Sequence, residues 1–171
     1  MAGGVRTLAD GNTKLTILIT RPANLDAITL TELQAGIEAS CKVAKSGTKF
    51  SPSASDTEQD APLCDEGNSA ALGASNYEGT LAPFWYLDKD GKYVLEDNAV
   101  YEAARAKGAT LTYVFREGPK SAVAWAQDDR YDAYVGVSDN PQKSDGGGYV
   151  KRTIPVQVQA AALDKTVAAS G

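Results

Sequence analysis

The sequence predicts a mainly β fold, a β-sandwich or barrel with one short flanking helix. Several segments alternate apolar and polar residues with the period of two that is typical of half-buried strands. Only residues 97–108 have their apolar residues at helical spacing. The 171 residues, 43% of them apolar, fit a single domain spanning residues 1–171. A domain of this size buries about 70% of its unfolded surface and needs no disulfide or metal to fold.

The stretch from Leu81 to Ala126 contains the predicted helix and changes periodicity on either side of it. Its apolar residues are first dense, then helically spaced, and then alternating, which predicts a strand, a short helix, a strand, a turn and a strand. Asp97 or Asn98 is the expected N-cap, and Gly108 stands where a C′ glycine belongs. At three turns or fewer the helix requires tertiary packing, so we expect it to lie across a sheet.

The strand after this helix has two different faces. Leu111, Tyr113 and Phe115 form an aromatic face that we expect to be buried. The opposite face is mostly polar and consists of Thr110, Thr112, Val114 and Arg116. Residues 117–120 predict a hairpin turn into a further strand at residues 121–126.

Two strands are predicted nearer the start of the chain. Residues 14–20 alternate Leu15, Ile17 and Ile19 with polar residues after an Asp-Gly-Asn turn signal. Residues 36–43 form a second strand, which places Cys41 on its apolar side as a small core residue. Cys64 falls in a loop, so the sequence neither requires nor excludes a disulfide between the two.

Residues 45–68 break the alternation and are rich in Ser, Pro, Asp and Glu. A structureless loop of this length inside a compact domain is uncommon unless it has a function. Phe50 and Leu63 are its large apolar residues, and we expect them to be contacts between subunits. The alternative is a flexible surface loop.

The last part of the chain predicts two strands and a tail. Residues 131–138 form the first strand, and a glycine-rich loop at residues 144–148 follows. The strand that begins at Val150 has the clearest alternation, and Pro155 within it predicts an edge strand or a bulge. Residues 160–171 are rich in alanine and are predicted to be an extension that does not fold alone.

The composition gives no support for catalysis. The sequence has no His, which removes the commonest general base and transition-metal ligand. Two cysteines do not make a zinc site, and the Asp88-Lys89-Asp90-Gly91 segment does not fit a calcium loop. We therefore expect no catalytic residue, no metal and no cofactor. The net charge of −5 disfavours nucleic acid as an affinity partner, because phosphate contacts need clustered Lys and Arg.

The sequence also predicts no membrane association. The N-terminal segment lacks the apolar core of a signal peptide, and the longest aliphatic run, LTILI, is far too short to cross a bilayer. We expect the protein to be made and kept in a reducing cytoplasm, or to leave it by a route other than a signal peptide.

Four blocks of the sequence resemble one known family. They are GASNYEGTLAPFWYLD, EDNAVYEAARAKG, LTYVFREG and YVKRTIPVQVQA, within residues 28–160. Their order and character are similar to those of the major tail tube proteins of long, non-contractile-tailed bacteriophages of actinobacterial hosts. The resemblance implies a β-sandwich with one flanking helix and a long loop, here residues 45–68, that reaches neighbouring subunits together with the chain termini.

The resemblance also implies a function. Subunits would close into rings, generally of six, and the rings would stack into a tube that conducts the genome. The implied partners are further copies of the chain, the tape measure protein, and the tail terminator and baseplate proteins. The implied location is the virion tail, after assembly in the bacterial host cytoplasm. Alternatives are a virion decoration protein or adhesin that binds a host-surface ligand and, third, an enzyme.

A tube through which DNA slides must not bind it, so the resemblance also implies a lumen that is acidic or neutral. The net charge of −5 agrees with such a lumen. Glu38, Glu78 and Asp132 are the candidate lumenal carboxylates, because each lies in or beside a strand and opposes apolar neighbours.

Overall fold

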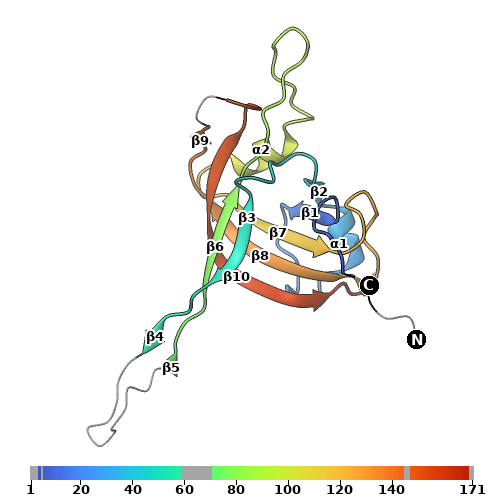
Figure 1. The fold of residues 1–171 in the computed structure, drawn as a ribbon, viewed down its shortest axis with the longest axis vertical. Helices are drawn as coiled ribbons and strands as arrows, with labels where there is room; N and C mark the ends of the chain where they lie inside the picture. Colours follow the sequence, from blue (N-terminus) through green and yellow to red (C-terminus); the bar gives the residue numbers. More distant parts are fainter. Residues whose placement is uncertain (1–3, 5, 59–70, 145–146, 170–171) are drawn as a thin grey trace, which may run out of the picture.

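Antiparallel strands make up most of the regular secondary structure, as predicted (Figure 1). The computed structural model describes residue 4 and residues 6–58, 71–144 and 147–169. Within them, eight strands form one sheet in the order β2-β1-β7-β8-β10-β6-β3, with β9 paired to β10, and β4 and β5 form a separate ribbon. The strands are β1 (Thr13–Leu18), β2 (Ile37–Glu38), β3 (Lys49–Ser53), β4 (Thr57–Glu58), β5 (Ala71–Leu72), β6 (Asn76–Leu81), β7 (Thr110–Glu117), β8 (Arg130–Ser138), β9 (Gln142–Lys143) and β10 (Arg152–Thr166).

The sheet curls until its two ends meet. Phe50 of β3 and Tyr113 of β7 are four strands apart in the sheet order, yet their ring centroids are 4.4 Å apart. A flat sheet would separate these strands by roughly 19 Å, at about 4.8 Å per strand. The segments after β2 and after β6 also meet, since the Ala44 N–H donates to the Ala82 carbonyl over 2.8 Å. The fold is therefore barrel-like.

The inside of the curled sheet is one hydrophobic core. Its buried members are Leu15, Ile17, Ala39, Leu81, Val100, Ala104, Leu111, Tyr113, Ile154 and Val156. Gly79 of β6 allows the close approach of β3 and β10: a Cβ there would lie 3.0 Å from Phe50 Cε1 and 2.9 Å from the Val156 carbonyl oxygen. A side chain at position 79 would thus force the two strands apart.

The predicted helix is α2 (Ala99–Ala104), which adds Val100 and Ala104 to this core. Asn98 is the N-cap, but its side chain makes no capping hydrogen bond. Instead, Asn98 Nδ2 donates to the carbonyls of Tyr86 and Val94 over 2.9 and 2.7 Å. Gly108 has a φ of +89° but lies beyond the C-cap residue Arg105, so it belongs to the following turn.

A second short helix, α1 (Leu30–Gln34), covers the outer face of the sheet and was not predicted. Its signal is in the sequence: Thr29 and Glu32 form a capping box in which each side chain accepts a hydrogen bond from the other residue's backbone. The outer core beneath it contains Leu18, Ile28, Leu33, Val114, Trp125, Tyr131, Ala133 and Val167.

The predicted polar faces of β1 and β7 are buried rather than solvated. Lys14 and Thr16 of β1 are 6% and 2% exposed, and Thr112 and Arg116 of β7 are both 1% exposed. Residues 121–126 cover them in an irregular path, so the strand predicted there is wrong. The carbonyls of this segment accept hydrogen bonds from side chains of the sheet, so they are not available to pair with a neighbouring strand.

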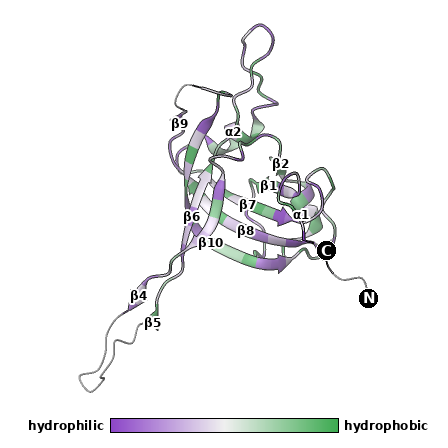
Figure 2. Ribbon diagram, viewed as in Figure 1, coloured by the Kyte–Doolittle hydropathy of each residue, from purple (hydrophilic) through white to green (hydrophobic). Residues whose placement is uncertain are grey.

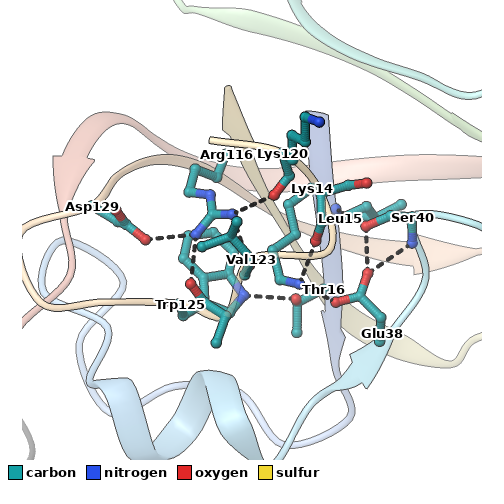
Figure 3. Close-up of polar contacts among 12 residues, drawn as sticks. Lys14, Leu15, Thr16, Glu38, Ser40, Arg116, Lys120, Val123, Trp125 and Asp129 are labelled. Carbon is teal, nitrogen blue, oxygen red and sulfur yellow. Dashed lines mark hydrogen bonds and ion pairs between the residues drawn. The ribbon is translucent and has the colours of Figure 1, made fainter. Parts of the chain in front are cut away.

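Arg116 makes most of these contacts (Figure 3). Its guanidinium donates to the carbonyls of Lys120, Val123 and Ala124 over 3.3, 2.9 and 3.0 Å. It also forms an ion pair with Asp129 at 2.7 Å. A buried charge needs such partners to offset its lost hydration.

Two further contacts fix the covering segment. Trp125 Nε1 donates to Thr16 Oγ1 over 2.8 Å, and the Trp125 ring lies 5.1 Å from the guanidinium carbon of Arg116. Lys14 Nζ donates to the Ser121 carbonyl over 2.9 Å and pairs with Glu38 (Figure 3). Lys14 and Arg116 are direct cross-strand partners, so each cation needs its own anion.

Residues 160–166 belong to β10 and do not form a loose extension, contrary to expectation. β10 runs to Thr166 and is central, between β8 and β6. Residues 160–166 pair with β8 after a bulge between Val158 and Ala160. Pro155 is tolerated because its carbonyl faces Asp139, just past the end of β8, so its missing N–H falls outside the ladder.

The strand predicted at residues 36–43 is reduced to the two residues of β2. Ala39 is buried and its N–H donates to the Leu15 carbonyl over 2.9 Å, but the chain then turns. Cys41 is exposed with a free thiol, so its assignment to the core is wrong. Cys64 lies outside the described residues.

Loss of the Asp129 carboxylate should leave the Arg116 charge buried without a counterion. We expect Asp129→Asn to lower the free energy of unfolding by about 3 kcal/mol. Arg116→Met/Asp129→Asn should be less destabilised than the sum of its single variants, because the pair is removed as a unit. Urea denaturation of all four proteins measures this coupling, and additive effects would contradict it.

Candidate assembly surfaces

A two-stranded arm projects from the body of the molecule (Figure 1). We define the arm as residues 54–58 and 71–75, which continue β3 and β6 away from the sheet. Its two sides are joined by β4 and β5, and Asp56 N–H donates to the Ala74 carbonyl over 3.0 Å. Asn76 Nδ2 closes the root of the arm by donating to Asp56 Oδ1 over 2.9 Å.

The strands of the arm are not covered by any other residue that the structure describes. All four residues of β4 and β5 are exposed, and Leu72 is 81% exposed. Figure 2 shows β4 as hydrophilic and β5 as hydrophobic. A two-stranded ribbon alone is marginally stable in water, so this arm is suited to packing against another molecule.

The net charge of the chain comes from this region. Residues 50–77 contain five acidic residues and no Lys or Arg: Asp56, Glu58, Asp60, Asp65 and Glu66. The remaining residues have 17 acidic and 17 basic side chains and are balanced. This feature was visible in the sequence but was missed, because the charge was considered only as a total. The net charge therefore comes from residues 50–77 of the sequence and gives no indication about a lumen.

Of the two residues predicted to contact neighbouring subunits, the structure describes Phe50 and not Leu63. Phe50 packs on its own core, with ring centroids 4.4 Å from Tyr113, 5.4 Å from Phe115 and 5.7 Å from Tyr134. Phe50 therefore belongs to the core of its own subunit, because residues 49–53 form β3 instead of part of a loop. Its contact with another subunit remains a prediction. Leu63 lies outside the described residues.

The three candidate lumenal carboxylates do not lie together. Glu38 of β2 and Thr16 are register partners, as are Thr16 and Val114, which places Glu38 on the outer face. Asp132 of β8 is the partner of Phe115 and lies on the inner face.

The third carboxylate, Glu78, lies in β6, which pairs with β3. It neighbours Gly79, the inner-face partner of Phe50, so Glu78 lies on the outer face. One sheet face can therefore present Glu38 and Glu78, or Asp132, but not all three.

Each of these carboxylates already has a partner in its own chain. Glu38 pairs with Lys14, and Glu78 pairs with Lys49 and accepts from Ser51 over 3.0 Å. Asp132 accepts the Asp164 N–H over 2.6 Å and so holds a second irregularity of β10, between Ala162 and Lys165, where Asp164 has a φ of +57°. A lysine therefore balances the charge of Glu38 and of Glu78, whereas Asp132 forms no ion pair with a described residue.

The pKa values agree with this pairing. Burial raises the pKa of Glu38, but hydrogen bonds from Lys14 and Ser40 outweigh it and hold the pKa below its ordinary value of 4.5. The hydrogen bond from Lys49, followed by that from Ser51, lowers the pKa of Glu78. Both side chains are therefore charged at neutral pH, and both are matched by a lysine.

Two kinds of site are not found in the described part of the chain. No group of three or more His, Cys, Asp or Glu residues there could hold a metal ion. None of the described helices has the length and apolar character needed to cross a bilayer.

A curled antiparallel sheet with a projecting, uncovered arm defines a module that is suited to assembly with other molecules. The family model for "Phage tail tube protein" matches residues 1–171, so the chain belongs to that family and is a structural component of the virion tail. No curated protein sequence matches the chain.

One solved structure that the chain is similar to is described as the cryo-EM structure of the anti-feeding prophage (AFP) baseplate, 6-fold symmetrised. The TM-score is 0.48 at 10% sequence identity, and the match covers 95% of each chain. A similarity of this degree is too low to establish a shared fold.

Replacement of Phe50 tests whether it acts in the subunit or between subunits. We expect Phe50→Ala to lower the free energy of unfolding by about 2–4 kcal/mol, because it opens a cavity between β3 and β7. Leu72→Ala, in the exposed arm, should change it by less than about 0.5 kcal/mol. Chemical denaturation of the monomer measures both. An unchanged stability for Phe50→Ala, with assembly lost, would instead support the intersubunit prediction.

The lowered pKa of Glu38 predicts a pH dependence of stability. Because the folded state holds the charged carboxylate more strongly than the unfolded state, its contribution is complete above the unfolded pKa and is lost as pH falls below about 4.5. Glu38→Gln should therefore cost about 1 kcal/mol at pH 7 and less at pH 3. Glu96→Gln, which removes an exposed carboxylate without an ion pair to a described residue, is the control. An equal cost of Glu38→Gln at both pH values would contradict the prediction.

Proposed function

We propose that this protein is the repeating subunit of the tail tube of a long, non-contractile-tailed phage. Copies form rings of six, and the rings stack into a tube through which the genome passes. The observation that supports this most directly is the exposed arm, which continues two strands of the sheet and has no partner among the described residues of its own chain. Membership of the tail tube family supports the same function.

The proposed tube has the partners that such an assembly needs. The tape measure protein occupies the lumen before DNA, and the terminator and baseplate proteins bind the two ends. The outer-face carboxylates Glu38 and Glu78 are proposed for the lumen, where their pairing with Lys14 and Lys49 makes the surface close to neutral. A neutral surface lets DNA slide, since phosphate binding depends on unpaired cations.

Electron microscopy of the purified full-length protein tests this proposal. We expect rings and stacked tubes with sixfold symmetry, and no retention of the protein on DNA at about 0.1 M salt. Particles that remain monomeric at every concentration, or that bind host-surface glycans without forming rings, would overturn it. The second outcome would instead support the decoration or adhesin function.

A further inference from the structure

A cavity lies on the inner face of the sheet, where β7 ends and β8 begins. We call it the aromatic cavity, and its lining includes Phe50, Phe115, Tyr134, Glu117 and Asp132. Its volume is about 260 Å³. Sites for drug-sized ligands occupy about 300–1,000 Å³. The aromatic cavity is therefore suited to one side chain or to a small molecule.

The pairing of β7 with β8 brings four of these side chains together. Phe115 and Asp132 are cross-strand partners. Glu117 and Tyr134 each lie two residues further along the same strands, so all four side chains are on the inner face. Phe50 is contributed by β3, which meets β7 and β8 because the sheet curls.

Three aromatic rings form one wall of the aromatic cavity. The ring centroid of Phe50 lies 5.4 Å from that of Phe115 and 5.7 Å from that of Tyr134, and the last two are 6.1 Å apart. Phe50 and Phe115 are only half-buried, so part of each ring stays accessible. The faces of aromatic rings are electrostatically negative and attract cations within about 6 Å.

The rest of the lining has an excess of negative charge. It contains the acidic residues Glu117, Asp132 and Asp164 and one basic residue, Arg130, which gives a net charge of −2. Arg130 pairs with Asp164 at 2.6 Å. Glu117 and Asp132 form no ion pair with any described residue. Two carboxylates without a counterion in the described chain thus lie beside an aromatic wall.

A buried hydroxyl without a partner also belongs to the aromatic cavity. Tyr134 is 3% exposed, and its hydroxyl makes no hydrogen bond with any described residue. A buried tyrosine hydroxyl usually has such a partner. Burial, followed by the negative charge of Asp132, raises the pKa of Tyr134 to about 12. The hydroxyl is therefore neutral at pH 7, and its oxygen is free to accept a hydrogen bond from a ligand.

We propose that the aromatic cavity binds an alkylammonium group. An ammonium group has three N–H donors, which match the carboxylates of Asp132 and Glu117 and the hydroxyl oxygen of Tyr134. Its apolar stem contacts the rings of Phe50 and Phe115. This site is independent of the proposed function and adds a binding activity to it.

A metal ion fits the aromatic cavity less well than an organic cation. Ions such as Ca²⁺ take about six to eight oxygen ligands. No group of three or more His, Cys, Asp or Glu residues in the described part of the chain could hold a metal ion. Aromatic rings also provide no oxygen ligand, whereas they contribute directly to the binding of an organic cation.

Calorimetric titration of the full-length protein with butylammonium at pH 7 tests this proposal. We expect saturable binding in the millimolar range, and binding of the uncharged 1-butanol about tenfold weaker, because it lacks the charge that the two carboxylates attract. Asp132→Asn/Glu117→Gln should also weaken butylammonium binding about tenfold. The new amide oxygen at position 132 can still accept the Asp164 N–H. Phe115→Leu should weaken binding about threefold, since it removes a ring but keeps an apolar side chain.

Two further variants complete this test. Glu96→Gln removes an exposed carboxylate outside the aromatic cavity and should bind butylammonium as the wild type does. Tyr134→Phe removes only the hydroxyl and should weaken binding about threefold, so it tests the site even if the double carboxylate variant does not fold. Circular dichroism checks the folding of every variant. Equal binding of 1-butanol and butylammonium, or unchanged affinity in the folded carboxylate and Tyr134→Phe variants, would overturn the proposal.

Alkylammonium groups come from two sources, free amines and the lysine side chains of proteins. Titration with putrescine and with Nα-acetyl-lysine N-methylamide distinguishes them. Tighter binding of putrescine identifies a free amine as the ligand, and tighter binding of the lysine derivative identifies a side chain of a partner protein. Failure of both to bind would overturn the proposal. None of these titrations requires rings or tubes, so that result would leave the proposed function standing.

Discussion

Contact between Phe50 of β3 and Tyr113 of β7 requires the sheet to bend through most of a closed barrel, and the rest of the structure depends on this bend. The bend places β3 and β6 side by side at the edge from which the arm projects. It also encloses the inner core, so that most of the apolar surface is used inside the subunit. Tyr149 and Leu72, the two most exposed of the large apolar side chains in the described part of the chain, lie beyond opposite ends of β6. Packing inside one subunit thus determines where it can meet another.

The buried polar residues on the outer face of β1 and β7, namely Lys14, Thr16, Thr112 and Arg116, have a different role from the hydrophobic core. Arg116 and Lys14 are adjacent cations on neighbouring strands, which would repel each other in a bare sheet. Asp129 and Glu38 neutralise them, and the carbonyls of Lys120, Ser121, Val123 and Ala124 accept further hydrogen bonds from the two side chains, while Arg116 Nε has no partner among the described residues. A long connection between β7 and β8 is thereby held in one path without any regular secondary structure. Such a network specifies a conformation more than it adds stability, because hydrophobic groups could fill the same space.

The strands that were predicted well are those with a regular apolar alternation on an inner face, such as residues 110–117 and 130–138. The alternation could not show that the polar face of β7 is also buried. Arg116 occupies the same place in the alternating sequence whether its side chain is solvated or is hydrogen-bonded to buried carbonyls. β3 was missed because Ser and Pro surround Phe50, and its pairing with β6 is set by residues nearly 30 positions away. Two signals were available locally and were not used, namely the Thr29–Glu32 capping box and the confinement of acidic excess to residues 50–77.

The central position of β10 affects how the subunit folds during its synthesis. β10 is the last strand along the chain, yet it joins β8 on one side to β6 on the other. The earlier strands can form only two separate parts until residues 152–166 have left the ribosome. Contacts between segments so distant in sequence also slow folding, because loop entropy is lost before the pairing is gained. A nascent chain therefore cannot present a finished barrel to its neighbours, which delays the association of subunits until each one has been synthesised as far as its final strand.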